Sequence, residues 1–212
     1  MLYVTTFVSL ILLHFVNIRN LYYALLVALF LFAAFRFEVG CDWTGYLNQY
    51  YVYGAIPFAG LIEEKEPLWV GLFILQNWLD LPYPWINVFS AAIFFFGTHI
   101  LAKRQSDPLA FLILLFPTLI INMPMSGIRQ AAAIGSMSIA FVAFGDRRLF
   151  RFVALTLVAS AFHASAMVFL IFAAFIDQNA SKIRLVLSLL VTIPIIVFLA
   201  STESAGMLTN RY

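Results

Sequence analysis

The chain has 212 residues, of which 64% are hydrophobic and 10% are charged, and its mean hydropathy is +0.98. A soluble globular domain carries roughly 25% charged residues, so this composition excludes the soluble class and indicates an integral membrane protein. The net charge of +2 comes from scattered Lys and Arg, which argues against nucleic acid as a partner, and the single cysteine, Cys41, excludes an intramolecular disulfide and a cysteine-based metal cluster.

Eight apolar runs, separated by charged or turn-forming residues, follow one another along the chain. They are residues 2–16, 21–35, 68–79, 85–102, 109–122, 128–144, 152–176 and 185–200. The first run has neither the basic start nor the small-residue cleavage site of a signal peptide, so we interpret it as a membrane segment. Several runs are shorter than the ~20 residues that span a bilayer, so their polar flanks enter the membrane or the segments stop partway.

Basic residues in two short loops predict the orientation of these segments. The residues are Lys103, Arg104, Arg147, Arg148 and Arg151. The positive-inside rule places both loops in the cytoplasm, and parity then places residues 122–129 and the acidic loop 36–67 on the outer face. One of the two runs between 67 and 103 must then be re-entrant or interfacial. We therefore predict an all-α, polytopic integral membrane protein: a single transmembrane domain over residues 1–212, with about seven transmembrane helices and an interfacial helical outer loop.

The outer loop opens with residues 36–46, which place three charges and two glycines between apolar stretches. Charges at the membrane boundary need partners or a function. Asp42 is suited either to cap a helix whose aromatic residues lie in the interface belt or to act in chemistry. These aromatic residues recur at helical spacing and are Trp43, Tyr46, Tyr50 and Tyr53. Arg36 is suited either to a functional contact or to snorkelling towards the lipid headgroups.

A second polar cluster, residues 122–130, lies between two apolar runs. Ser126 is expected to cap the following helix, whose free amides then point outward around Arg129. A cation in the first helical turn opposes the helix dipole, and a bound phosphate reverses that penalty. The alternative is an ion pair between Arg129 and a loop carboxylate such as Asp42 or Glu66. A stripe of small residues for close helix packing is also present and consists of Gly127, Ala131 and Gly135.

His163 stands near the middle of the apolar run 152–176, among alanine and serine residues. An ionisable group at that depth is costly unless it faces a polar cavity. It is therefore suited to accept a proton, to donate a hydrogen bond to a sugar or phosphate, or to make a polar contact between helices. His14 and His99 lie in apolar runs without comparable neighbours, and we interpret both as structural.

The familiar signatures of other enzyme classes are missing from the sequence. It contains no phosphate-binding glycine loop, no His-Glu-x-x-His, no Gly-x-Ser-x-Gly and no Cys/His zinc pattern. Nucleotide-driven and metal-hydrolase activities therefore have no support, and we expect neither a cofactor nor a metal ion.

Four pieces in a fixed order carry a resemblance to a known family. They are Arg36 to Tyr46, Glu66-Pro67, Gly127-Ile128-Arg129-Gln130 with the alanines that follow, and Phe162-His163-Ala164-Ser165-Ala166. With these pieces the chain resembles the EpsG-like family of bacterial exopolysaccharide polymerases, which is functionally related to the Wzy O-antigen polymerases. Family members are usually longer, so the resemblance implies that residues 1–212 are a C-terminally truncated part of a longer polymerase.

The resemblance implies a multi-pass glycosyltransferase of the bacterial inner (plasma) membrane, active on the outer face. The substrate is an oligosaccharide carried on undecaprenyl diphosphate, which is transferred onto another lipid-linked unit; membrane lipids, a flippase and a chain-length regulator are the further partners. The expected base is Asp42 or His163, which compete for the acceptor proton. The substrate-binding residues are expected to be Arg36, Tyr46, Glu66, Arg129 and Gln130.

Two functions of other classes stay open from the sequence. A membrane acyltransferase acting on sugars would use His163 as the base. A non-catalytic transport or assembly subunit for polysaccharide would use the same polar residues to line a pathway or to hold helices together.

Overall fold

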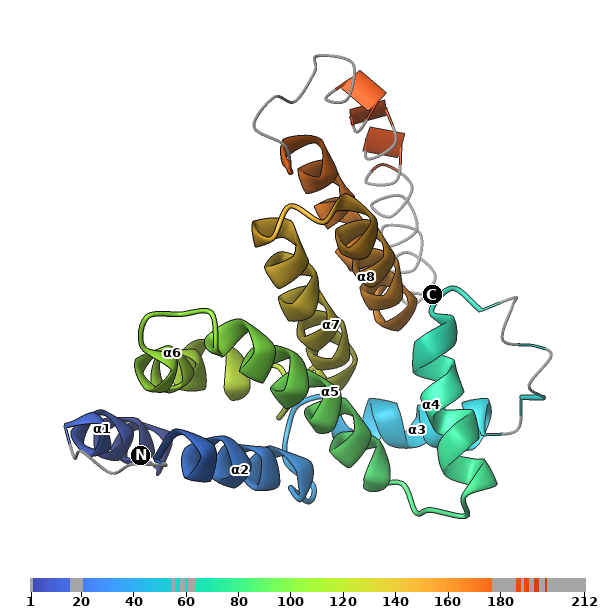
Figure 1. Ribbon diagram of the computed structural model, residues 1–212. Helices are drawn as coiled ribbons and strands as arrows, with labels where there is room; N and C mark the ends of the chain where they lie inside the picture. The colour runs from blue at the N-terminus through green and yellow to red at the C-terminus, as the bar shows by residue number, and fades with distance from the viewer. Residues whose placement is uncertain are drawn as a thin grey trace.

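A computed structural model of the chain shows a helical protein. It describes residues 2–15, 21–54, 56, 57, 60 and 64–176, together with residues 186, 187, 189, 190, 193, 194 and 197. The α-helices are α1 (Leu2–His14), α2 (Leu21–Ala34), α3 (Trp43–Tyr53), α4 (Pro67–Trp78), α5 (Trp85–Ala102), α6 (Pro108–Leu115), α7 (Ile128–Gly145) and α8 (Leu149–Phe162). A π-helical segment, η2 (Phe116–Ile120), continues α6, and a 3-10 segment, η3 (Ala164–Phe175), follows α8 (Figure 1).

Apart from α3, the helices lie on the first seven predicted apolar runs. The prediction of the seventh run, 152–176, as one segment is wrong, because the chain breaks at His163 into α8 and η3, and η3 returns beside the end of α7, where the rings of Phe172 and Phe144 are 6.2 Å apart. No strand occurs among the residues described above, so the all-α class is confirmed. The eighth run, 185–200, lies almost entirely outside the described residues. By length and composition, two of the described helices, α5 and α7, are able to cross a membrane, and each has 18 residues. The other apolar helices have 10–17 residues. The figure of about seven crossings therefore stays a prediction.

Helices α5 and α7 cross at the centre of the fold. Their backbones approach each other closely there, because glycines lie at the contact. A Cβ atom on Gly97 would collide with the carbonyl oxygen of Gly135, and a Cβ on Gly135 would collide with the carbonyl oxygen of Ile93. The Ser90 hydroxyl donates to the Ile128 carbonyl across the same interface. Small residues thus let two helices pack without a side-chain layer between them, as the stripe predicts at Gly135. Gly127, the first residue of the predicted stripe, instead faces the side chains of Gln130 and Met123.

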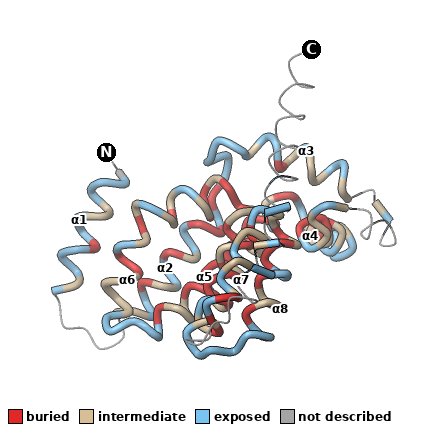
Figure 2. The backbone as a smooth tube through the Cα atoms, turned by 90° about the horizontal axis from the view of Figure 1, so that it is seen from above, coloured by how far each residue is buried: buried red, intermediate tan, exposed pale blue. Residues whose placement is uncertain are grey.

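Around this crossing, α2 packs on α5, and α8 lies beside α7 (Figure 1). Buried residues gather along α5 and α7, whereas α1 at the periphery is largely exposed (Figure 2). Both histidines interpreted as structural join helices: His99 Nδ1 is hydrogen bonded to the Tyr22 hydroxyl at 2.9 Å, and His14 Nε2 lies 3.5 Å from the Asp107 carboxylate.

The two predicted cytoplasmic loops meet at one end of the fold. Arg104 Nη1 and Nη2 donate to the two carboxylate oxygens of Asp146 at 3.1 and 3.0 Å, which joins residues 103–108 to residues 145–151. This contact agrees with the prediction that both loops lie on one side of the membrane. The loops predicted to face outward meet at the opposite end of α5 and α7.

The outer loop folds back as α3 and α4, which share an aromatic core. The predicted helix over the aromatic repeat is confirmed, but its repeat packs inward rather than in a lipid-facing belt. Tyr46 is buried against Trp69, with ring centroids 5.5 Å apart, and Trp43 contacts Tyr83 at 5.0 Å. The exposed aromatic of α3 is Tyr51, which the repeat does not include.

Helix α4 has 12 residues, which at ~1.5 Å per residue is about 18 Å and too short for ~30 Å of hydrocarbon. A turn anchors its end, since Gln76 Nε2 donates to the carbonyls of Pro82 and Tyr83 at 2.6 and 3.1 Å. This geometry supports the prediction that one of the two runs between 67 and 103 does not cross the membrane.

Candidate functional site

The first two polar clusters of the sequence come together at the outward end of the fold. Arg36 Nη1 donates to the Pro124 carbonyl at 2.9 Å, and the Cys41 amide donates to the Ser126 hydroxyl oxygen at 3.2 Å. Gly40 has a φ of +107°, and a Cβ there would collide with the Met125 carbonyl oxygen, so this contact requires glycine. The loop after α2 is thus fixed on the loop before α7.

The predicted cap by Ser126 is wrong. The N-cap of α7 is Gly127, and no side chain caps the helix. The Ser126 hydroxyl accepts the Cys41 amide instead, because the loop 36–42 lies close enough to supply that donor. The start of α7 therefore keeps its amides free of a side-chain cap, with Arg129 in the first turn.

Arg36 is buried, which contradicts snorkelling towards the headgroups. Its Nη2 donates to the Asn87 side-chain oxygen at 2.8 Å, and its guanidinium lies 5.9 Å from the centre of the Trp43 ring. Burial lowers the pKa of Arg36 to about 10, which still leaves it charged at neutral pH. Arg36 therefore ties α2, α5 and the loop 122–127 together.

Asp42 occupies the N-cap position of α3 but makes no side-chain capping hydrogen bond, so its interpretation as a bonded cap is wrong. The backbone at Asp42 has φ −99° and ψ 8°, away from the extended values in which a cap side chain reaches the next amides. The side chain is exposed. Asp42 is thus a solvent-facing carboxylate beside the outer loop.

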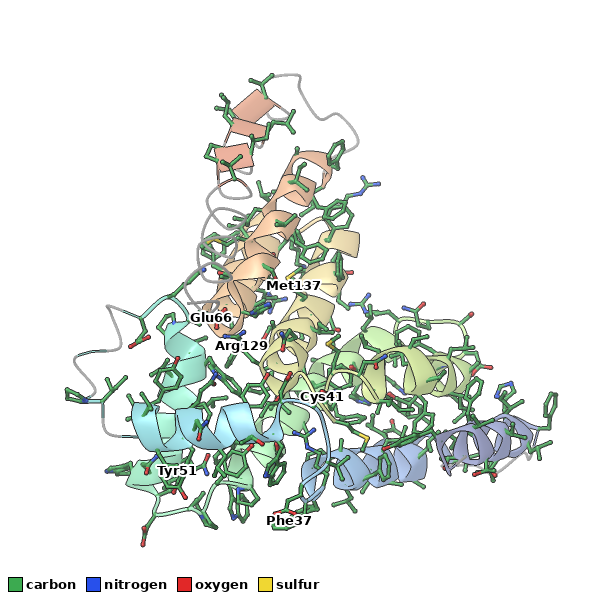
Figure 3. All side chains as sticks on the ribbon, turned by 180° about the vertical axis from the view of Figure 1, so that it is seen from behind. Phe37, Cys41, Tyr51, Glu66, Arg129 and Met137 are labelled. Carbon is green, nitrogen blue, oxygen red and sulfur yellow. The ribbon has the colours of Figure 1, made fainter. Side chains whose placement is uncertain are left out.

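Glu66 is the centre of the polar site, because three donors from two segments, the start of α7 and the junction of α8 with η3, converge on its carboxylate. Arg129 Nη1 of α7 donates to Oε2 at 2.8 Å, and His163 Nδ1 lies 3.0 Å from Oε1. The Ala164 amide, at the start of η3, also donates to Oε1 at 3.0 Å. Glu66 and Arg129 lie side by side in Figure 3. Of the alternatives for Arg129, the structure has the ion pair with Glu66.

Local backbone rules explain how the three segments reach one point. Glu66 precedes Pro67, which disfavours helical backbone at Glu66, and Pro67 is the first residue of α4. His163 has φ −151° and ψ 116°, so α8 ends there and η3 begins at the next residue. The break frees the Ala164 amide from helical pairing and makes it available to the carboxylate.

The electrostatics of this cluster favour ionised Glu66. Burial by itself raises the pKa of the carboxyl group, since the side chain is only 11% exposed. The hydrogen bonds from His163 and Ala164 and the charge of Arg129 outweigh that effect, so the pKa of Glu66 lies below its ordinary value. An ionised carboxylate only accepts hydrogen bonds, so we assign the proton to Nδ1 of His163, which leaves Nε2 as the basic nitrogen.

Arg129 keeps donor capacity beyond its pairing with Glu66. The ion pair uses Nη1, and within the described part of the chain Nε of Arg129 is buried with no hydrogen-bond partner. The side chain is 31% exposed, so part of the guanidinium is accessible. A buried guanidinium donor without a partner is suited to a ligand oxygen.

Gln130, the next residue, contacts the aromatic core of the outer loop. Its Oε1 lies 3.5 Å from the Tyr46 hydroxyl, which is a long hydrogen bond. Burial raises the pKa of the Tyr46 hydroxyl above its ordinary value, so this group stays a neutral donor. Tyr46 thus supports the start of α7 through Gln130, and its ring is packed against Trp69 rather than exposed to a sugar.

A polar cavity of about 290 Å³ lies beside the Glu66 cluster. Glu66, Arg129 and His163 line it, and so do residues that the sequence did not predict as site residues: Tyr53, Glu64, Lys65, Trp69, Val70, Ala164 and Ser165. Neither Arg36 nor Asp42 is among the lining residues. The predicted site residues therefore divide into three groups. Glu66, Arg129 and His163 line the cavity, Tyr46 of α3 contacts Gln130 of α7, and Arg36 and Asp42 lie in the outer loop.

The Ala164 amide is the functional group that the sequence did not predict. A helix break usually carries Pro or Gly, and the segment around His163 has neither. The signal that points there is the histidine itself, since an ionisable side chain inside an apolar run needs polar partners.

Comparison with known proteins identifies one family. The sequence model of a family described as the EpsG family matches residues 19–210. No curated protein and no solved structure matches the chain. The match covers every residue of the Glu66 cluster and of the outer loop.

Proposed function

This chain belongs to the EpsG family, and on that premise we propose that it is a membrane glycosyltransferase that polymerises polysaccharide repeat units. The donor is an oligosaccharide on undecaprenyl diphosphate, and the acceptor is a hydroxyl group of another lipid-linked unit. The reaction takes place on the outer face of the bacterial inner membrane and extends exopolysaccharide or O-antigen. Membrane lipids, a flippase and a chain-length regulator are the partners we propose.

The observation that carries this proposal is the convergence of Arg129, His163 and the Ala164 amide on Glu66 beside a polar cavity. Glycosyl transfer from a diphosphate needs a base for the acceptor and positive charge for the leaving group. The cluster offers both within one cavity: a histidine oriented by a carboxylate and a guanidinium with an unused buried donor.

In the proposed mechanism, the acceptor oxygen forms a bond to the anomeric carbon as the bond from that carbon to the diphosphate breaks. The acceptor proton moves to Nε2 of His163, and the electron pair leaves with the diphosphate. Glu66 holds Nδ1–H of His163, which fixes the tautomer and stabilises the imidazolium that forms. Arg129 stabilises the negative charge on the departing diphosphate.

His163 is a better candidate base than Asp42 on this geometry. His163 lines the polar cavity and is oriented through Nδ1, whereas Asp42 is exposed and does not line that cavity. We therefore assign the base to His163 and treat Asp42 as a surface charge of the outer loop.

Two substitutions of His163 separate a base from a polar contact between helices. Asn places an amide donor near the position of Nδ1 and keeps the hydrogen bond to Glu66, whereas Gln reaches towards the position of Nε2 without its basicity. In cells that lack the chromosomal copy, both variants should leave single repeat units on the lipid, and His99→Gln, outside the site, should give a normal ladder on a polysaccharide gel. A normal ladder with His163→Asn would contradict the assignment and favour a structural contact.

The same experiment tests the two other functions. Missing acyl groups on polymer of normal length would indicate a membrane acyltransferase. A shortened ladder in cells without the protein that His163→Gln restores in full would indicate a transport or assembly subunit, and an unchanged ladder would favour neither a polymerase nor an acyltransferase.

A further inference from the structure

A second cavity of about 370 Å³ lies behind the Glu66 cluster. Its walls come from α5, α6 with η2, α7 and η3. Its size falls within the ~300–1,000 Å³ that is usual for small-molecule pockets. The proposed mechanism makes no use of it.

The cavity follows one face of α7. Gln130, Ile134, Met137 and Phe141 line it at spacings of four, three and four residues, which is one stripe of a helix. Eleven residues of α-helix span about 17 Å, so the cavity is long in the direction of the helix axis. Figure 3 shows Met137 farther along α7 from the end that carries Arg129.

The polarity of the lining changes along this length. At the outward end lie Gln130, His163 and Ser165, and the last two also line the polar cavity. The lining is otherwise apolar apart from Thr98 and Ser138, and the Ser138 hydroxyl donates to the Ile134 carbonyl of its own helix at 2.9 Å. The two cavities thus adjoin at His163 and Ser165, one polar and the other mainly apolar.

We propose that the apolar cavity binds the isoprenoid chain of the lipid-linked donor. This inference rests on the proposed function, because the diphosphate held by Arg129 fixes where the chain begins. From there the first isoprene units pass His163 and Ser165 and continue along the α7 stripe. The stripe on α7 faces η3 and is one residue wide. This shape suits a single isoprenoid chain rather than the two parallel acyl chains of a phospholipid. Flexible Met137 fits the irregular outline of a methyl-branched chain.

Photolabelling of the full chain in phosphatidylcholine vesicles tests this proposal. The probe is undecaprenyl phosphate that carries a diazirine in its chain, which contains no sugar and requires no catalysis. We expect cross-links on Met137, Phe141 and Phe169, and few on Leu114, which is 64% exposed on α6. Unlabelled undecaprenyl phosphate should remove the cross-links. Equal labelling of Leu114, or removal by phosphatidylglycerol at the same concentration, would overturn the proposal.

A filled cavity gives the matching functional test. Ile134→Trp adds volume on the cavity stripe, and Leu114→Trp adds it on an exposed surface as the control. We expect Ile134→Trp to reduce labelling and to raise KM at least tenfold for the full-length donor, with KM unchanged for a donor on a two-isoprene chain. An equal loss for both donors, or undiminished labelling, would overturn the proposal.

The two proposals fail in distinguishable ways. Cavity labelling in a protein whose His163→Asn variant makes normal polymer would keep the lipid site and reject the base. Polymer formation that depends on His163, without cavity labelling, would keep the proposed function and reject the lipid site.

Discussion

The two ends of the helical core use the same pair of residue types in different surroundings. At one end Arg104 and Asp146 form a bidentate ion pair, and their side chains are 57% and 30% exposed. At the other end Arg129 donates to Glu66 through Nη1, and the two side chains are 31% and 11% exposed. Geometry alone would rank the first pair as the stronger contact.

Burial reverses that ranking. An exposed ion pair contributes ~0–1 kcal/mol, because water screens the charges and the side chains lose entropy. Glu66 instead collects two further donors, His163 and the Ala164 amide, which is more than an ion pair between two loops requires. The exposed pair thus needs no role beyond joining two loops, whereas the extra donors on Glu66 are the reason we propose the buried cluster as the reactive site.

We predict that the two ends of the helical core lie on opposite sides of the membrane. In intact cells an impermeant maleimide should label the exposed native Cys41. In a Cys41→Ser background, Gln105→Cys should stay unlabelled until the cells are permeabilised, because residues 103–108 carry the basic residues expected in the cytoplasm. Labelling of position 105 in intact cells would overturn the topology.

The next largest effect is expected from the central carboxylate. Glu66→Gln keeps the shape but removes the charge that orients His163, so polymer formation should fall by on the order of a hundredfold, the usual worth of general-base assistance. The matched control at the other end is Asp146→Asn, which should leave polymer formation unchanged. If both variants lose activity equally, the buried cluster has no special role.

Arg129→Lys should have a smaller effect, with normal insertion. Lysine keeps the charge but lacks the planar fork that serves Glu66 and a phosphate oxygen together. The loss of one charge-assisted hydrogen bond, worth ~1.5–3 kcal/mol, corresponds to roughly a tenfold to hundredfold slower reaction. The readout is kcat with purified lipid-linked donor. A near-normal rate would mean that Arg129 only balances Glu66.

The parts of this site that could be predicted from the sequence are those whose evidence lies in neighbouring residues of the chain. Glu66, Arg129 and His163 stand out because charged or ionisable residues interrupt apolar runs, and that signal survives without any knowledge of the fold. Helix α5 was predicted with its bounds, since apolar composition and the Pro84 boundary are local as well. The pairing of Arg129 with Glu66 was one of two alternatives, because sequence spacing does not say which loops meet.

The remaining features depend on contacts that are distant in the sequence. From the sequence alone, snorkelling towards the lipid headgroups is one of two alternatives for Arg36. The acceptors that it binds in the structure, on Pro124 and Asn87, lie 88 and 51 residues away in the sequence. The aromatic repeat of α3 fits a membrane interface equally well until α4 covers it. The helix break at His163 has no Pro or Gly beside it that would predict it from the sequence. The hydrogen bond from the Ala164 amide to Glu66 is therefore found only in the structure.

The ionisation of Glu66 makes the stability of the folded protein depend on pH. The pKa of Glu66 is lower in the folded protein than the ~4.3 of a free glutamate, so its ionisation stabilises the fold at pH values above that figure. This contribution is lost as the pH falls through the lowered folded pKa. In detergent, the thermal unfolding midpoint of the wild type should therefore exceed that of Glu66→Gln at pH 7, and the gap should close below about pH 4. A gap that widens in acid would contradict the direction of the shift.

The smallest effect is expected for Asp42→Asn, although the sequence offers Asp42 as a competing base. The side chain is exposed, makes no capping bond and lines neither cavity, so loss of its charge should change polymer formation less than about twofold, the scatter usual for surface substitutions. The measurement is polymer length on a gel beside His163→Gln, with insertion checked for both. Loss of polymer in Asp42→Asn together with a normal ladder in His163→Gln would return the base to Asp42. That outcome would also require the loop 36–42 to move over the polar cavity when substrate binds, and with it Cys41, whose amide now donates to Ser126.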